Sequence, residues 1–179
     1  VKMEIFNSPH SLDEIIDLVD TISIILDVKD EGMITINKMK KEFEIISQKI
    51  VDYEFNPKVI FFMNPSVGSF TAAGRKTRAD YLIEFLGGDN VFSSQFSKYK
   101  KVTKEQIVNF NPDLILVSSY SNDDHKSSSI FINSDEFKSV AAVINDRVID
   151  IDMGAFLSFG PSFTSNVLEL IENLNLDRK

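Results

Sequence analysis

Apolar and polar residues recur with two different periods, one before and one after about residue 56. Ser11 and Glu14 have the S-x-x-E spacing of a capping box, which marks the start of a helix. Behind it, apolar residues follow the three- and four-residue spacing of an amphipathic helix, first to Leu26 and then, after Gly32, from Met39 to Tyr53. The pattern predicts two helices, or one long broken helix, over residues 11–53. Before them, weak alternation over Val1–Phe6 predicts a strand that ends in a turn.

After Pro57, short apolar runs alternate with amphipathic stretches. The runs predict buried strands at Val59–Met63, Leu114–Ser118 and Arg147–Ile151. The stretches between and after them predict helices at Arg78–Leu86, after the Thr103 capping box, at Asn133–Val143, and from Pro161 to about Leu174. Strands that alternate with helices predict an α/β fold, with a parallel or mostly parallel sheet flanked by helices.

Composition narrows the function classes. The 179 residues include 27 acidic and 19 basic ones, for a net charge of -8, so a nucleic-acid partner is not expected. No run of apolar residues is long enough to cross a membrane, the first residues lack the basic and apolar regions of a signal peptide, and there is no cysteine. Residues 1–55 carry 6 basic and 12 acidic residues, whereas residues 56–179 carry 13 and 15, which indicates two different units. Because the chain begins at Val1, we expect it to be a piece of a longer protein.

In an open α/β sheet, ligands bind beyond the carboxyl ends of the strands, and three predicted loops lie there. The first, from Asn64 to Ala79, contains Arg75, Lys76 and Arg78 and no acidic residue. The absence of acidic residues suggests an anion site, and arginine beside the positive end of a helix, which is unfavourable by itself, adds slightly to that hypothesis. A solvated loop that leads into a helix is the other interpretation, and the loop sequence by itself slightly favours it.

The second loop begins at Tyr120, which follows a predicted strand and could stack on a ligand or bind ferric iron through its phenolate. Asp123, Asp124 and His125 follow closely, but adjacent residues in a polar loop rarely converge on one metal ion. We therefore predict no metal site there. His10 is expected to be structural.

The third loop, Met153 to Phe159, is more apolar than an exposed loop requires. Its residues Met153, Phe156 and Phe159 either pack under a neighbouring element or line an aromatic pocket. For catalysis the sequence offers neither a nucleophile motif nor a metal-protease motif, and only two histidines. These observations predict a binding protein rather than an enzyme, with no cofactor of its own.

The order of motifs resembles the C-terminal lobe of class III substrate-binding proteins of ABC transporters, which bind ferric siderophores, haem or cobalamin. The matching segments are Thr71–Gly74, Leu86–Val91, Val102–Gln106, Asn111–Val117, Ala141–Val143, Asn145–Val148 and Gly160–Pro161. The resemblance implies that residues 1–10 are a remnant strand and linker from a missing N-terminal lobe. It also implies that residues 11–55 are the helical segment between lobes and residues 56–179 the C-terminal, Rossmann-like lobe.

The resemblance further implies a monomeric protein outside the cytoplasmic membrane, either a membrane-anchored lipoprotein or a periplasmic protein. Its ligand would be an iron complex, a ferric siderophore first and haem second, bound between the lobes near Arg75, Tyr120 and Phe156. Glu105, within the V-T-K-E-Q motif, would dock onto arginines of the permease. Many siderophore binders have an arginine after the late proline, whereas this chain has Ser162, which leaves the ligand class open.

Two other classes remain open from the sequence. One is an α/β domain that resembles a nitrogenase component or flavodoxin, although the cluster cysteines and phosphate loop of such proteins are absent. The other is an interaction domain that binds no small ligand.

Overall fold

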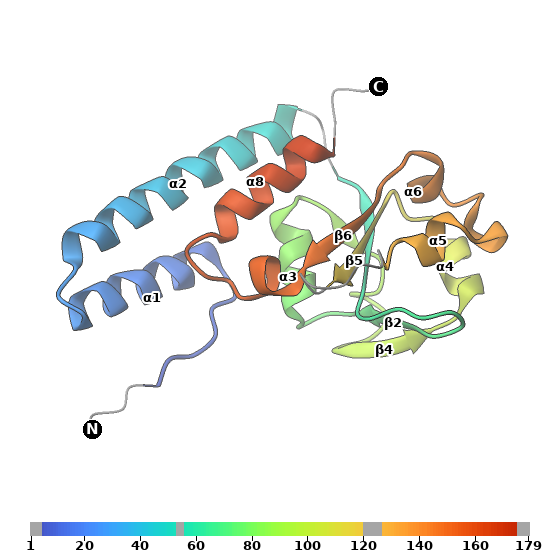
Figure 1. Ribbon diagram of the computed structural model, residues 1–179, viewed down its shortest axis with the longest axis horizontal. Helices are drawn as coiled ribbons and strands as arrows, with labels where there is room; N and C mark the ends of the chain where they lie inside the picture. The colour runs from blue at the N-terminus through green and yellow to red at the C-terminus, as the bar shows by residue number, and fades with distance from the viewer. Residues whose placement is uncertain (1–4, 53–55, 120–126, 175–179) are drawn as a thin grey trace.

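The computed structural model describes residues 5–52, 56–119 and 127–174, and it shows a helical hairpin that leads into an α/β lobe (Figure 1). The helices are α1 (Leu12–Ile25), α2 (Lys29–Asp52), α3 (Arg78–Phe85), α4 (Lys104–Phe110), α5 (Ser129–Ile132), α6 (Ala141–Ile144), α7 (Met153–Leu157) and α8 (Phe163–Asn173), with a 3₁₀ turn at Asp135–Phe137. The strands are β1 (Lys58–Phe62), β2 (Phe70–Ala73), β3 (Asp89–Asn90), β4 (Tyr99–Val102), β5 (Leu114–Ser119) and β6 (Val148–Asp152).

The sheet has the order β4-β2-β1-β5-β6, and β3 pairs with the start of β1. Strands β1, β5 and β6 run parallel, with Phe62 opposite Val117 and Ser119 opposite Asp152. Strands β2 and β4 are antiparallel additions at the edge. The sheet is therefore mostly parallel and flanked by helices, as the sequence predicts.

Strand β1 divides the core into two layers, because its successive side chains point to opposite faces of the sheet. Val59 and Phe61 pack into a cluster with residues of α2, α3 and α8. Ile60 and Phe62 pack into a second cluster with residues of α4, α5 and α6. Figure 1 shows the same division, with α2 and α8 together on one side and α4 and α5 on the other. Burial on both faces explains why β1 is apolar at every position after the exposed Lys58.

The two N-terminal helices form a hairpin. The break falls at Asp27, which has the left-handed φ of 56°, rather than at Gly32. Gly32 lies in the first turn of α2, where a Cβ atom would approach the Cβ of Ser23 to 2.4 Å. Glycine at this position therefore lets the two helices come close together.

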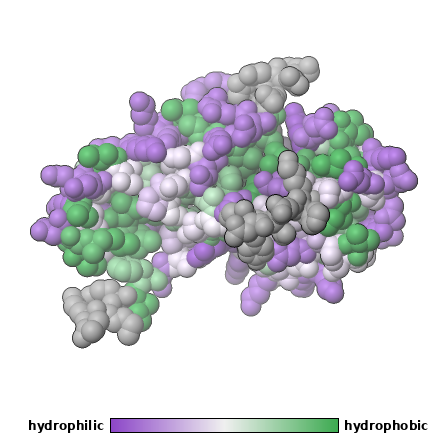
Figure 2. Space-filling model, in the orientation of Figure 1, coloured by the Kyte–Doolittle hydropathy of each residue, from purple (hydrophilic) through white to green (hydrophobic). Residues whose placement is uncertain are grey.

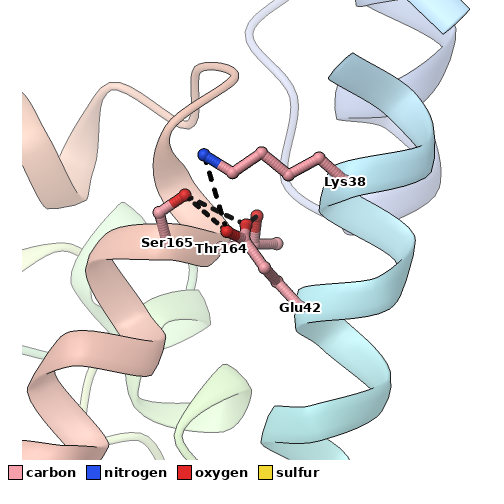
Figure 3. A network of polar contacts seen from close by, with 4 residues as sticks. All are labelled: Lys38, Glu42, Thr164 and Ser165. Atoms are coloured by element: carbon pink, nitrogen blue, oxygen red, sulfur yellow. Dashed lines mark hydrogen bonds and ion pairs between the residues drawn. The ribbon is translucent and has the colours of Figure 1, made fainter. Parts of the chain in front are cut away.

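A carboxylate fastens α2 to α8 (Figure 3). Glu42 accepts hydrogen bonds from the hydroxyls of Thr164 at 2.7 Å and Ser165 at 2.9 Å, and Lys38 lies 3.6 Å away. Thr164 is fully buried. These contacts join the hairpin to the last helix of the lobe.

The end of the hairpin exposes apolar side chains. Seven of the fourteen exposed large apolar residues in the described parts of the chain lie there: Ile22, Ile24, Ile25, Leu26, Val28, Met33 and Ile34. Figure 2 shows apolar surface among hydrophilic residues at this end of the molecule. Such clustering is typical of a surface that contacts another folded unit.

Several predicted elements differ from the structure. The predicted loop from Asn64 to Ala79 contains strand β2. The sequence did not predict this strand, because it is defined by its pairing with β1 and β4. The helix predicted over Asn133–Val143 is instead divided between the 3₁₀ turn and α6, and the loop Met153–Phe159 contains α7. Of the predicted strand Val1–Phe6, residues 1–4 lie outside the described residues, and Ile5 and Phe6 are not in a strand.

Candidate functional site

The parallel strands bring their following loops to one edge of the sheet, where a pocket of about 710 Å³ opens. Met63 follows β1 and Met153 follows β6, and both line this pocket. The loop after β5 begins at the same edge, but residues 120–126 lie outside the described residues. The complete lining is His10, Met63, Lys76, Thr77, Arg78, Lys98, Tyr99, Met153, Gly154, Leu157 and Ser158.

The pocket is basic, although the chain as a whole is acidic. Lys76, Arg78 and Lys98 line it, and no acidic side chain is among the described lining residues. Apolar walls come from Met153 and Leu157. Cations beside an apolar wall favour a ligand that is anionic and partly apolar.

Backbone hydrogen bonds join the two loops that carry these cations. Gly74 N–H donates to the carbonyl of Lys98 at 2.9 Å, and Lys98 N–H donates to the carbonyl of Arg75 at 3.0 Å. Arg75 N–H in turn donates to the carbonyl of Phe96 at 3.0 Å. A Cβ atom on Gly74 would lie 2.3 Å from that same Phe96 oxygen, so only glycine fits this close approach. Backbone hydrogen bonds therefore hold the two loops at the pocket rim in fixed positions relative to each other.

Arg78 is held by the opposite wall of the pocket. Its Nη1 donates to the carbonyl of Leu157 at 2.6 Å, which joins the start of α3 to the end of α7. A guanidinium has five N–H donors, so Arg78 can bind an anionic ligand and keep this bond.

Tyr99 supplies a neutral hydroxyl. Burial raises the pKa of Tyr99, and the Thr77 hydroxyl, the Ala79 backbone and the charge of Arg78 only partly oppose that rise. The phenol therefore stays protonated at neutral pH and can donate a hydrogen bond to an anion.

The structure brings together some of the predicted site residues. Arg78 and Met153 line the pocket. Arg75 is exposed at the rim, where its backbone takes part in the loop pairing. Phe156 is half-buried against the core. Tyr120, Asp123, Asp124 and His125 lie outside the described residues.

Phe159 is in the core. Its ring is 1% exposed and stacks on Phe163 with centroids 4.5 Å apart, so it offers no surface to a ligand in this conformation. Packing under a neighbouring element, one of the two alternatives for this segment, applies to Phe159.

Sequence reasoning missed Met63, Lys98 and Tyr99, and it assigned His10 a structural role only. His10 lines the pocket and also stacks on Tyr81 at 4.8 Å. Lys98 reaches the rim because its φ of 64° turns the chain before β4, and a left-handed lysine leaves no signal in the sequence.

Glu105 lies away from the pocket, in the first turn of α4, and is fully exposed. The pKa of Glu105 is lowered by its own backbone N–H, by the Thr103 hydroxyl and by the charge of Lys104. Its carboxylate is therefore ionised and available to a partner, as the docking hypothesis requires.

The described residues contain no group of three or more histidine, aspartate or glutamate side chains placed to hold a metal ion. Among the described helices, none combines the length and the apolar character needed to span a membrane.

Comparison with known proteins places these features in a family context. A family model described as periplasmic binding protein matches residues 2–154. The high-affinity haem uptake system protein IsdE of Staphylococcus aureus is 28% identical over 120 residues, which are 65% of this chain and 40% of that protein. The chain thus spans less than half the length of this curated relative.

Solved structures share the fold. The periplasmic haem-binding protein BhuT, in complex with two haems, superposes with a TM-score of 0.78 at 24% identity, covering 94% of this chain and 64% of that one. HutB of Vibrio cholerae, a periplasmic haem-binding protein, gives 0.79 at 20% identity, covering 96% and 66%. A protein from a Fe³⁺-hydroxamate transport system of Saccharomonospora viridis gives 0.73 at 17% identity, covering 92% and 56%.

The raised pKa of Tyr99 predicts a loss of stability at alkaline pH. The folded state holds this proton more tightly than the unfolded chain, so the unfolded state ionises first as the pH rises past about 10. The free energy of unfolding should therefore fall above that pH, and it should fall less in Tyr99→Phe. Urea unfolding at a series of pH values measures this, with Tyr81→Phe as the control. Equal slopes in wild type and Tyr99→Phe would contradict it.

Proposed function

The chain belongs to the periplasmic binding protein family, and on this basis we propose that it is the extracytoplasmic substrate-binding component of an ABC importer for an iron complex. The observation that carries the proposal is the basic, partly apolar pocket at the carboxyl ends of the parallel strands. The descriptions of the relatives, which are binding and uptake proteins, agree with a binding function and favour neither an enzyme nor a nitrogenase-like domain.

The proposed ligand is an anionic iron chelate. Ferric complexes of catecholates and carboxylates carry negative charge and broad apolar or aromatic surface, which Lys76, Arg78 and Lys98 and the adjacent methionines can complement. The sequence favours a ferric siderophore. Haem, whose two carboxylates give it the same combination of properties, is the second candidate, because three of the proteins compared above are described as haem-binding or haem-uptake proteins.

We further propose that residues 56–179 form one of two lobes and that the ligand binds between them. Residues 11–55 would connect the lobes, and residues 1–10 would end the first one. The similar structures are longer than this chain, which covers 64% of BhuT and 66% of HutB. The exposed apolar end of the α1–α2 hairpin also supports contact with a further folded unit.

In this proposal the protein acts outside the cytoplasmic membrane, as an anchored lipoprotein or a periplasmic protein, and docks onto the permease through Glu105. An exposed carboxylate that stays ionised is suited to pairing with an arginine. Such contacts guide encounter and orientation more than they add affinity.

The ligand class is tested by calorimetry on the two-lobed protein with haemin, a ferric tris-catecholate and a neutral ferric tris-hydroxamate. We expect sub-micromolar binding of at least one anionic complex, weaker binding of the neutral one, and weak binding to this chain alone. Arg78→Ala should weaken anion binding about tenfold or more, because a charge-assisted hydrogen bond is lost. Arg75→Ala should cause a smaller loss, because this exposed charge is screened by solvent.

Lys40→Ala is the matched control, since Lys40 is exposed on α2 and its removal also lowers the charge by one. Tightest binding of the neutral complex would refute the proposed ligand class. Unchanged affinity in Arg78→Ala and Arg75→Ala would show that the basic loop does not contact the ligand.

The docking role is tested by Glu105→Arg in the two-lobed protein. Ligand affinity should stay the same, whereas uptake of the iron complex in cells should fall at least about tenfold, because a like charge would face the permease. Glu44→Arg, on an exposed position of α2, makes the same charge change elsewhere. If uptake with Glu105→Arg equals that with Glu44→Arg, Glu105 is not a docking residue.

A further inference from the structure

Beneath the pocket rim, a buried carboxylate holds the basic loop in place. Asp80 is 3% exposed, and both of its oxygens are used: Oδ2 accepts from the backbone N–H of Lys76 at 3.0 Å, and Oδ1 accepts from Asn90 Nδ2 at 2.7 Å. We propose that Asp80 is a positioning residue, which holds Lys76 in its unusual backbone conformation and so fixes the basic rim for an anionic ligand. The proposal rests on the function proposed above and assigns a residue that does not itself line the pocket.

The backbone of Lys76 is strained, which is why it needs a fixed partner. Its φ is 61°, in the left-handed region that a residue with a side chain rarely adopts. Strained residues of this kind persist only where the surrounding structure enforces them, and they cluster at functional sites. The bond from the Lys76 N–H to Asp80 supplies such enforcement next to the ligand pocket.

Three of the N-terminal caps in the described helices, those of α1, α3 and α4, show that the arrangement at Asp80 is not simply a capping box. In the box at α4, the Gln106 side chain accepts from the N–H of the cap residue itself, Thr103. At α3, Thr77 is the cap, yet Asp80 accepts from the residue before it, Lys76. Helix α1 repeats this variant, since Glu14 accepts from His10 N–H at 2.7 Å while Ser11 is the cap.

The two variant caps share one consequence. Asp80 accepts from Lys76 and Glu14 accepts from His10. Both Lys76 and His10 line the same pocket. Thr103, which donates to Gln106 in the ordinary capping box at α4, does not line this pocket. In both helices, therefore, the carboxylate binds the residue before the cap, and that residue lines the ligand pocket.

Asn90 connects Asp80 to the sheet. Its Nδ2 donates both to Asp80 and to the carbonyl of Ala73 at 3.2 Å, and its Oδ1 accepts from the N–H of Phe92 at 3.2 Å. Thr77 adds a bond from its hydroxyl to the carbonyl of Gly74 at 2.9 Å. The loop is thus tied at both ends to buried, rigid parts of the lobe, with Asp80 as the central acceptor.

Two variants change the hydrogen bonds of Asp80 in different ways: the single substitution Asp80→Asn, and an exchange of Asp80 with Asn90. In Asp80→Asn, the new amide has one acceptor oxygen for two donors, so either Lys76 N–H or Asn90 Nδ2 must face another donor. In the double exchange Asp80→Asn with Asn90→Asp, the oxygen of the new amide can accept from Lys76 while its nitrogen donates to the new carboxylate. The bond to the Ala73 carbonyl is then lost, and an oxygen of the new carboxylate at position 90 faces that carbonyl oxygen instead.

The experiment measures two properties of the full-length protein: exchange of the Lys76 amide hydrogen by NMR, and the affinity for haemin and for a ferric tris-catecholate. In wild type, we expect the Lys76 amide to be protected before any ligand is added. Asp80→Asn should remove that protection and weaken binding of the tighter probe about tenfold. The double exchange should restore protection of the Lys76 amide and part of the affinity, because the bond to Lys76 is regained while the one to the Ala73 carbonyl is not.

Glu42→Gln is the stability control, because Glu42 also makes several hydrogen bonds but joins α2 to α8 rather than the pocket. It should lower the melting temperature and leave affinity unchanged. Protection and affinity that persist in Asp80→Asn would overturn the proposal, as would a loss of affinity in Glu42→Gln equal to that in Asp80→Asn. If wild type binds neither probe, the proposed ligand class fails, while the Lys76 amide still tests the positioning by Asp80.

Discussion

Parallel pairing of β1 with β5 and of β5 with β6 is the constraint on which the rest of the structure depends. Parallel strands end at the same edge, so the segments after them are forced together whatever their own sequences are. Each strand must also return through a crossover, which places helices on both faces and buries residues 59–62 of β1 on both sides. The pocket beyond Met63 and Met153 is a direct consequence of this topology.

The pocket concentrates like charges and strained backbone in a small region, and both features are unfavourable by themselves. Lys76 and Lys98 both have left-handed φ values, and their side chains line the same space. Their positions are maintained by the paired backbone of the two loops and by the buried carboxylate of Asp80. A site that is rigid before it meets its ligand loses less entropy on binding, which is a physical reason to hold this strain at the rim.

The sequence predicted the parts of this molecule that depend on local periodicity. The buried strands at β1, β5 and β6, the first two helices and the cap at Thr103 follow from spacing that is visible in the chain. Strands β2, β3 and β4 are short and are defined by their partners, so a single-sequence pattern does not reveal them. In place of one helix at residues 133–143, the structure has a 3₁₀ turn and the short helix α6. Local apolar spacing does not distinguish one long helix from two short turns that each pack against the sheet.

The candidate site was predictable in location but only partly in composition. Residues from the predicted loops after β1 and β6 line the described pocket, and the basic residues near Arg78 are among them. Lys98 and Tyr99 join the site through backbone pairing with Arg75, which is a tertiary contact. Phe159 lies in the core because its ring stacks on the buried Phe163, which is a tertiary contact that the local sequence does not indicate.

The central claim is that an anionic iron chelate binds at the pocket formed by these loops. Its most direct test is NMR of the isotopically labelled two-lobed protein, titrated with a diamagnetic gallium analogue of the tightest-binding chelate. The account predicts chemical-shift changes concentrated at Lys76, Thr77, Arg78, Lys98 and Tyr99. Changes concentrated instead at the exposed end of the α1–α2 hairpin, or spread without any maximum at the pocket, would contradict it.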